Sequence, residues 1–368
     1  MRDGAARPRG ARRLGAAHRE KEAGMAPHAA GKLAAGAVAA GAVLLAVVPG
    51  VATAGDGPGQ YPVPWTFAAA VPAGMQDGPD VPPPGSHDAG QPCSSAAHPE
   101  PVVLVHGLAA DQSENWQTIA PFLSDNGYCV YSLTYGNNAS APRPFDQVGG
   151  LADMTRSAQV LAAFVQQVLA VTHAAKVDVV GHSEGGTMPD WYLKFDGGSR
   201  YVDHFVALSG VLHGTQFWGA GAAYALGQAY GSPGSAPQIA ALLTTGCTSC
   251  DEFLPTSPWM KALDDPGTSG PASAPATVCP YDGASVEGVS YTSIATTNDE
   301  LVRPPTSDFI DPRCANAHNI LVQDQCAADQ ADHISIAADP VAAQDILNAL
   351  DPQTARPVIC YPVLPAVG

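Results

Sequence analysis

Residues 176–187 read Lys-Val-Asp-Val-Val-Gly-His-Ser-Glu-Gly-Gly-Thr, and this stretch decides the fold. Its first part, Val177 to Val180, has the mostly apolar character of a strand buried in a sheet. A Gly-x-Ser-x-Gly pentapeptide follows at 181–185, and the sequence after it is compatible with a helix. A sharp strand-to-helix turn strains the backbone of the serine and leaves no room for side chains at the two glycines. We therefore interpret Ser183 as a nucleophile on such a turn, rather than as an incidental serine in a glycine-rich loop.

Strands and helices alternate on both sides of this turn. The apolar run at 101–107 predicts a strand buried on both faces, and apolar residues at three- and four-residue steps predict a helix at 151–172. Further strands are expected at 128–133, 204–209, 289–295 and 319–322, and further helices at 111–124, 184–195 and 340–350. This order predicts an α/β fold with a mostly parallel central sheet and helices on both faces.

Some segments carry local signals of their own. Ser113 can cap the amino end of helix 111–124, and Pro189 must distort or divide the helix after the nucleophile. From 214 to about 285 the alternation stops, and Gly, Ala, Pro and Ser surround scattered aromatic residues. Long aperiodic stretches inside a domain are usually functional or disordered. We expect a cap-like insertion there, after the strand that follows the nucleophile helix; ordinary core packing of its aromatic residues is an equal alternative.

Residues 1–54 have the organisation of an export signal. Basic residues precede an apolar run at 33–48, and Ala52-Thr53-Ala54 offers a cleavage site, so we expect cleavage after Ala54. A membrane anchor is the competing interpretation, but the run is short and rich in Ala and Gly. The sequence therefore predicts a secreted protein without a stable membrane anchor. We expect a mostly irregular mature segment at 55–97 and one folded domain at 98–368.

The charge balance limits the partners of the mature chain. The formal net charge is −17, and residues 1–54 hold eight of the 17 Lys and Arg residues but only three of the 34 Asp and Glu residues. The remainder is therefore strongly acidic, which repels the phosphates of nucleic acids. We expect no nucleic-acid partner and a monomer.

All eight cysteines lie beyond the export signal. An even number in an exported chain predicts disulfides, although eight cysteines allow 105 pairings. We expect the pairs Cys93–Cys129, Cys247–Cys250, Cys314–Cys326 and Cys279–Cys360. No His and Cys spacing indicates zinc, and we expect neither a metal nor a cofactor.

A serine hydroxyl needs a base and an acid that orients the base. On a fold with this serine turn the chain order is Ser, then Asp or Glu, then His. Asp299 follows the strand expected at 289–295, at the edge where the site should lie, and is favoured over Glu300, Asp308 and Asp311. His333 lies in the loop after the last expected strand and is favoured as the base. His318 comes just before that strand, at the end away from the site, and a surface loop is the alternative setting for His333.

Acyl transfer builds negative charge on an oxygen, which needs two backbone N–H donors. One donor is expected from Glu184, directly after the nucleophile, and the other from Leu108 in the His-Gly loop after the first strand. His106 and His182 are interpreted as packing or hydrogen-bonding residues. The Glu184 carboxylate could modulate Ser183 or face solvent.

These motifs resemble those of secreted bacterial class 2 lipases, which are triacylglycerol lipases and esterases with the α/β-hydrolase fold. The likeness rests on Val105-His-Gly-Leu, Gly181-His-Ser-Glu-Gly-Gly, Thr297-Asn-Asp-Glu-Leu-Val and Asp332-His-Ile, and it covers residues 98–352. It implies Ser183 as nucleophile, Asp299 as acid, His333 as base, and ester or lipid hydrolysis without a cofactor. The Glu after the nucleophile departs from the family, where Gln or Met is frequent.

Three other functions remain open from the sequence. A polyester or cutin-like hydrolase would use the same residues, and so would an acyltransferase, in which an alcohol instead of water resolves the acyl-enzyme. A non-catalytic binding protein on a hydrolase scaffold is a third possibility. Retention of all three candidate residues in the expected order argues against it.

Overall fold

The computed structural model describes residues 61–69, 77–215 apart from Pro142 and Pro144, 246–271 apart from Thr268, and 277–366. The expected export signal and the expected cleavage site after Ala54 lie outside these residues. Within them, no helix is both long enough and apolar enough to cross a membrane.

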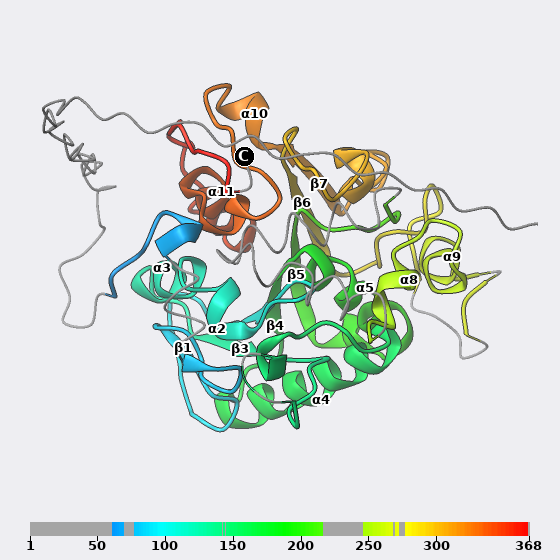
Figure 1. Cartoon of the computed structure of the whole chain (residues 1–368), viewed down its shortest axis with the longest axis horizontal. Helices are drawn as coiled ribbons and strands as arrows, with labels where there is room; N and C mark the ends of the chain where they lie inside the picture. Colours follow the sequence, from blue (N-terminus) through cyan, green and yellow to red (C-terminus); the bar gives the residue numbers. More distant parts are fainter. Residues whose placement is uncertain are drawn as a thin grey trace, which may run out of the picture. The chain divides into compact units, whose positions relative to one another are not determined.

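The core of the protein is one sheet of seven parallel strands in the order β1-β3-β2-β4-β5-β6-β7 (Figure 1). The strands are β1 Ser86–His87, β2 Val102–Val105, β3 Val130–Leu133, β4 Val177–His182, β5 Val202–Leu208, β6 Ser290–Ala295 and β7 Ala317–Leu321. Parallel strands need a crossover connection between them, and the helices found between these strands provide it. This is the architecture that the alternation in the sequence predicts, and it is the α/β-hydrolase fold.

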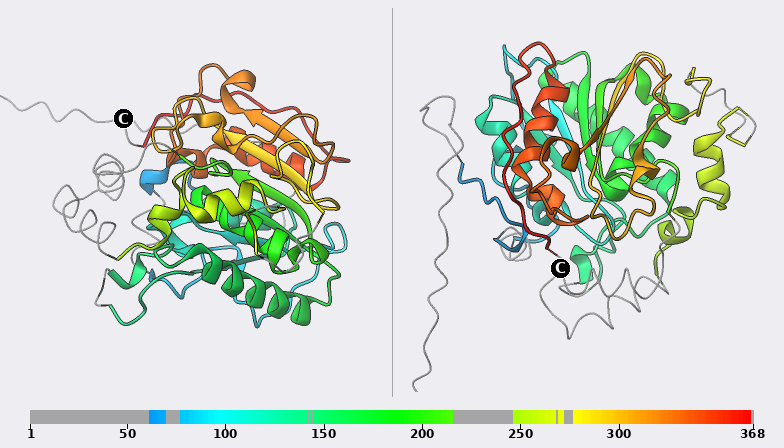
Figure 2. Two further views of the ribbon diagram at one scale, coloured as in Figure 1. Left: turned by 90° about the vertical axis from the view of Figure 1, so that its right-hand side faces the viewer. Right: turned by 90° about the horizontal axis from the view of Figure 1, so that it is seen from above.

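Both faces of the sheet are covered, so alternate residues of β2 enter two separate cores. Val103 and Val105 pack with one cluster and Val102 and Leu104 with the other, and all four are fully buried. The first cluster includes apolar residues of α4 Met154–Thr172 and α5 Met188–Phe195, and the second those of α3 Ile119–Asp125 and α11 Pro340–Leu350. Figure 2 shows α4 and α11 on opposite sides of the sheet. Burial on both faces explains the continuous apolar run of this strand.

The shorter elements of the described residues connect or flank these helices. They are α2 Gln112–Asn115, α8 Ser249–Glu252, α9 Pro258–Asp264, α10 Val322–Gln325 and the 3₁₀ helices η1 Phe145–Gln147, η2 Ser183–Gly186, η3 Gly198–Arg200, η4 Pro305–Asp308 and η5 Ser335–Ala338. Of the insertion expected at 214–285, α8 and α9 lie within the described residues, whereas 216–245 lie outside them.

Proline divides two of the expected helices. The segment 111–124 forms α2 and α3 instead of one helix, because Pro121 has no N–H for an interior helical bond and fits only in the first turn of α3. The cap of α2 is Asp111, whose carboxylate accepts from the Glu114 N–H at 2.7 Å, so the expectation that Ser113 is the cap is wrong. Pro189 likewise stands in the first turn of α5, after η2.

The amino-terminal segment is more ordered than expected. Ser86 and His87 add a short edge strand to β3, and residues 61–69 lie against α3. The Trp65 ring meets that of Phe122 edge to face at 5.3 Å, and Thr118 Oγ1 donates to the carbonyl of Pro64 at 2.6 Å. Contacts to the folded domain therefore hold this segment in place.

Four disulfides join Cys93 to Cys129, Cys247 to Cys250, Cys279 to Cys314 and Cys326 to Cys360. The first two pairs are as expected, and the expected pairs Cys314–Cys326 and Cys279–Cys360 are wrong. Strand β7 is the reason: Cys314 precedes it and Cys326 follows it, so extended chain carries the two to opposite ends of the sheet. Disulfide geometry cannot span that separation.

We predict that the double variant Cys326→Ser/Cys360→Ser folds with a free energy of unfolding reduced by about 2–4 kcal/mol, because this disulfide closes a loop of 34 residues. Urea denaturation of the variant and the wild type measures the difference. Peptide mapping of the wild type without reductant should recover the Cys279–Cys314 and Cys326–Cys360 peptides; recovery of a Cys314–Cys326 peptide would contradict the assignment.

Candidate active site

Ser183 sits at the turn between β4 and η2 with a φ of +55°, in the left-handed region that ordinary residues avoid. The turn is possible because its two glycines have no side chains. A Cβ on Gly181 would lie 1.6 Å from the Gly185 carbonyl oxygen, and one on Gly185 would lie 1.9 Å from the Val105 carbonyl oxygen. The strained serine is therefore held by close backbone contact with β2.

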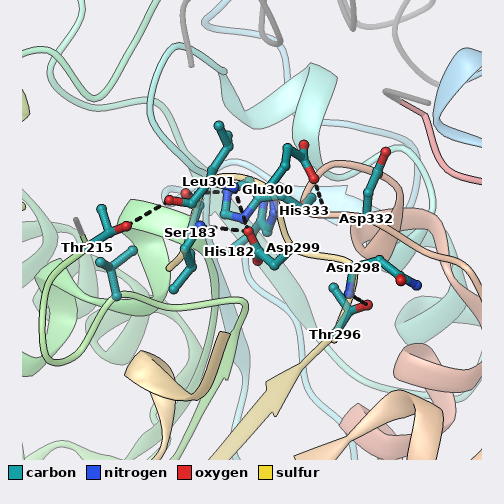
Figure 3. A network of polar contacts seen from close by, with 12 residues as sticks. His182, Ser183, Thr215, Thr296, Asn298, Asp299, Glu300, Leu301, Asp332 and His333 are labelled. Atoms are coloured by element: carbon teal, nitrogen blue, oxygen red, sulfur yellow. Dashed lines mark hydrogen bonds and ion pairs between the residues drawn. The ribbon is translucent and has the colours of Figure 1, made fainter. Parts of the chain in front are cut away.

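His333 lies between Ser183 and Asp299 (Figure 3). Its Nε2 is 2.8 Å from Ser183 Oγ, and its Nδ1 is 2.8 Å from Asp299 Oδ2. Because a carboxylate only accepts, Nδ1–H donates to Asp299 and Nε2 is left to accept the Ser183 proton. The structure thus brings His333 together with two residues that are 34 and 150 positions from it in the chain.

The Asp299 carboxylate is fully committed to hydrogen bonds. Its Oδ1 accepts from the backbone N–H groups of Leu301 and Val302 at 2.9 and 2.7 Å, while Oδ2 faces the imidazole. Burial alone would raise the pKa of this carboxyl, but His333 and the two N–H groups outweigh burial and lower it. Asp299 therefore stays ionised beside the base.

The environment of His333 favours its protonated form. Burial lowers its pKa, but the carboxylates of Asp299, Glu300 and Asp332 together raise it above the ordinary value of 6.5. Glu300 also accepts from the backbone N–H of His333 at 3.3 Å. A base of this kind can take a proton from serine and hold the resulting positive charge.

The other histidines near the serine are neutral and serve other contacts. His182 Nε2–H donates to the carbonyl of His333 at 2.8 Å, and burial, with the charge of His333 second, lowers its pKa to about 3. His106 Nε2 accepts from the Tyr135 N–H at 3.1 Å, and burial lowers its pKa to about 4. Both residues have the hydrogen-bonding role expected from the sequence.

The remaining candidate histidines lie elsewhere. His318 is inside β7, opposite Thr292 of β6, instead of before the strand as expected. His204 faces Asp178 at 2.8 Å near the amino ends of β4 and β5, away from the serine turn at their carboxyl ends.

The two expected oxyanion donors flank the serine. Residues 107–110, which we call the oxyanion loop, form a turn closed by the Ala110 N–H and the Gly107 carbonyl at 3.3 Å, with Ala109 at a φ of +63°. A Cβ on Gly107 would lie 3.1 Å from Ser183 Cβ, so the loop is adjacent to the nucleophile. Within the described residues the Leu108 N–H meets no acceptor, and the Glu184 N–H belongs to the first turn of η2.

The side chain of Glu184 does not face solvent. It is fully buried, which excludes the solvent-facing alternative left open by the sequence. Burial raises the pKa of its carboxyl well above the ordinary value.

Two supporting residues were not found from the sequence. Thr215 Oγ1 donates to the carbonyl of Leu301 at 2.8 Å (Figure 3). It also accepts from the Arg303 N–H at 3.0 Å, and the two hydrogen bonds hold the loop after Asp299 in place. Asn115 accepts from the Gly107 N–H at 2.8 Å and so holds the oxyanion loop. No motif marks either residue, because their partners are backbone groups distant in the chain.

A cleft that is partly open to solvent is lined by Ser183 and His333, and the empty space in it, open solvent included, is about 590 Å³. Polar residues of the site form its floor. Its other walls are mainly apolar and include Phe67, Leu108, Val211, Phe253, Leu301, Val302 and Ile334. A cleft of this character suits a ligand with an apolar chain and one reacting polar group.

Two clusters in the described residues have the spacing of metal ligands. Cys279, Asp282 and Cys314 form one, but its two sulfurs are joined in a disulfide. Asp178, Asp203 and His204 form the other, near the amino ends of β4 and β5. Neither cluster includes Ser183, Asp299 or His333.

Known proteins that are similar to part of this chain are lipases. Residues 99–261 match the family model described as Lipase (class 2). Triacylglycerol lipases of Pseudarthrobacter phenanthrenivorans and Burkholderia plantarii are each 41% identical over 96 residues, which are 25% of this chain and 27% and 24% of theirs. The chain thus spans about a quarter of the length of these relatives, in a segment too short to include all the site residues.

The fold also has solved counterparts. The crystal structure of Aspergillus fumigatus lipase B aligns with a TM-score of 0.51 and 20% identity, over 82% of this chain and 61% of that one. This likeness concerns the fold. The match of the family model concerns the sequence of residues 99–261, which include β4 and the turn at Ser183. Residues 99–261 are therefore similar in sequence to the class 2 lipases, and the chain as a whole has an α/β-hydrolase fold.

Proposed function

We propose that this protein is a secreted serine hydrolase that cleaves carboxylic esters of apolar acyl groups through an acyl-serine intermediate. One observation carries the proposal. His333 bridges Ser183 and Asp299 at 2.8 Å on each side, and Ser183 stands on a strained turn at the end of an apolar cleft. The family match supports a lipase or esterase.

The chemistry follows from the proton positions. His333 Nε2 takes the Ser183 proton while Oγ attacks the ester carbonyl, and Asp299 stabilises the imidazolium that forms. The N–H groups of Leu108 and Glu184 bind the oxyanion of the tetrahedral intermediate. His333 then protonates the leaving alcohol, and water, activated by the same base, releases the acid from the acyl-serine.

The apolar walls of the cleft favour an acyl chain as the group that is bound, and the triacylglycerol lipases among the relatives point the same way. A polyester hydrolase or an acyltransferase would use the same groups. Four disulfides support an exported protein, because such bonds persist in oxidising compartments. We propose that residues 1–54 direct export and are removed, and that the mature chain acts as a monomer.

We predict that wild-type protein reacts with a fluorophosphonate probe and hydrolyses p-nitrophenyl esters, whereas Ser183→Ala does neither. His333→Ala should also lose turnover, because no other base reaches Ser183 among the described residues. His318→Ala is the matched control, and this variant should keep the wild-type rate of ester turnover, because His318 lies in β7. Probe labelling and ester turnover measure both. An unlabelled, inert wild type would contradict the proposed function.

We predict that Asp299→Asn lowers kcat by about 10³–10⁴-fold, because the imidazole loses the partner that orients it and stabilises its charge. Activity requires neutral His333, so kcat/KM of the wild type falls as the pH drops through the raised pKa of this group, above 6.5. Removal of the Asp299 charge lowers that pKa, and the acid limb of the residual activity moves to lower pH. Rate profiles against pH measure this shift.

Asp311→Asn is the control for the acid. Asp311 was a competing candidate, and its carboxylate pairs instead with Arg313. Its variant should keep the wild-type rate and the wild-type acid limb. An acid limb at the same pH in Asp299→Asn and the wild type would contradict the assignment of Asp299.

We predict that Phe67→Ala lowers kcat/KM for esters of long acyl chains by about 5–30-fold relative to acetyl esters, because a large apolar wall of the cleft is lost. The ratio of rates on octanoyl and acetyl esters measures the effect. Phe145→Ala removes a partly exposed phenylalanine outside the cleft and should leave the ratio unchanged. An unchanged ratio in Phe67→Ala would rule out a role for the amino-terminal segment in acyl binding.

A further inference from the structure

Glu184 supplies a backbone N–H to the proposed oxyanion site, and its side chain is unusual for a buried acid. The side chain is fully buried, and neither carboxyl oxygen makes a regular hydrogen bond within the described residues. Burial of an ionised carboxylate without partners is very costly, whereas a neutral carboxylic acid can donate one hydrogen bond. The surroundings of Glu184 decide which form is present.

The two hydroxyl groups that face the Glu184 carboxyl are those of Tyr135 and Ser249. Both hydroxyl groups donate hydrogen bonds to backbone carbonyls. Tyr135 donates to His106 O at 2.8 Å, and Ser249 donates to Gly150 O at 2.5 Å. Each hydroxyl can therefore only accept from Glu184, and a hydrogen bond between them requires a protonated Glu184.

The carboxyl also lies beside the oxyanion loop. Gly150 stands between them, since a Cβ built on it would lie 2.9 Å from Leu108 Cα and 3.1 Å from Glu184 Oε2. Its φ is +71°, and its N–H donates to Tyr135 O at 2.8 Å. Gly150 is therefore packed close to both the Glu184 carboxyl and Leu108, the residue expected to carry the oxyanion donor.

Burial and Glu252 raise the pKa of Glu184, and they outweigh the Tyr135 and Ser249 hydroxyl groups, which lower it. Glu252, beside the start of α4, raises the pKa of Glu184 further, after the larger effect of burial. Burial raises the pKa of Glu252 itself to about 8, so Glu252 becomes a carboxylate at alkaline pH. Burial raises the pKa of Tyr135 well above the ordinary value, and His106 on β2 is neutral.

We propose that the Glu184 side chain is a positioning residue that acts as a neutral acid, donating its proton to the Tyr135 hydroxyl and thereby holding the oxyanion loop in place. The inference rests on the proposed hydrolase function, because it concerns the oxyanion site of that reaction. It also explains why a carboxylic acid can replace the Gln frequent at this position: both carry a donor of the same length.

The charge of the Glu184 side chain should affect turnover. When Glu184 ionises, the donor is lost and a negative charge appears beside the N–H groups that should bind an oxyanion. Turnover must then fall at alkaline pH, with kcat affected and KM little changed, because the charge opposes the transition state more than the neutral ester.

The test compares Glu184→Gln, Glu184→Met and the wild type in kcat and KM, from about pH 7 to about pH 10.5. Gln keeps a donor and cannot ionise, so its kcat at pH 7 should stay within about threefold of the wild type and the alkaline loss should disappear. Met has a similar length but no donor, so its kcat should fall about tenfold or more with KM within about twofold.

Glu252→Gln provides a second, independent measurement. It leaves the Glu184 carboxyl in place but removes the charge that raises its pKa, so the alkaline loss of activity should begin at lower pH than in the wild type. Ser157→Ala is the matched control, because it removes a buried polar group of α4 that is not among the groups that shift the pKa of Glu184, and it should leave the alkaline limb unchanged.

The outcomes separate the inference from the function on which it rests. A wild type that neither labels nor turns over ester refutes the function. An active wild type whose profile is flat at alkaline pH, or whose alkaline loss persists unchanged in Glu184→Gln, overturns the inference alone, as do equal rates in Glu184→Met and Glu184→Gln. If Glu184→Met does not fold, the shifts in Glu184→Gln and Glu252→Gln decide.

Discussion

The close approach of two backbones at the serine turn is the constraint on which the site depends. Gly185 lies so near the Val105 carbonyl that no side chain fits between them, and Gly181 is equally close to Gly185. This contact places the end of β4 against the end of β2, and therefore the proposed nucleophile Ser183 against the oxyanion loop. The same contact keeps Ser183 in its left-handed conformation, since the sheet on both sides prevents the turn from relaxing.

Around that contact the protein assembles its polar groups from loops at the carboxyl ends of the strands. Asp299 follows β6, His333 follows β7, and the oxyanion loop follows β2. Two backbone N–H groups and His333 satisfy the Asp299 carboxylate, so its charge is kept in the interior. The Glu184 carboxyl accepts from no backbone N–H within the described residues, and burial raises its pKa well above the ordinary value, which favours the neutral form. Two buried acids of the same site thus differ in charge because their hydrogen-bond partners differ.

Buried acids without donors also link folding to pH. Burial raises the pKa values of Glu114, Glu184 and Asp308 well above the ordinary values of 3.8 to 4.5. A folded-state pKa above the unfolded one means that the carboxyl group binds its proton more tightly in the native protein than in the unfolded chain. Their contribution to stability is therefore complete at acid pH, and it is lost as the pH rises through the raised values.

The sequence by itself determined the order of the strands and helices along the chain, the serine turn, and the chain order of the proposed nucleophile, acid and base. These are local properties: burial on both faces makes a strand continuously apolar, and a tight turn needs glycine. Tertiary structure alone decided the pairing of four of the cysteines, because β7 separates two that are close in sequence. It also decided the roles of Asn115 and Thr215 and the neutral state of Glu184, since each depends on backbone groups or burial supplied by distant parts of the chain.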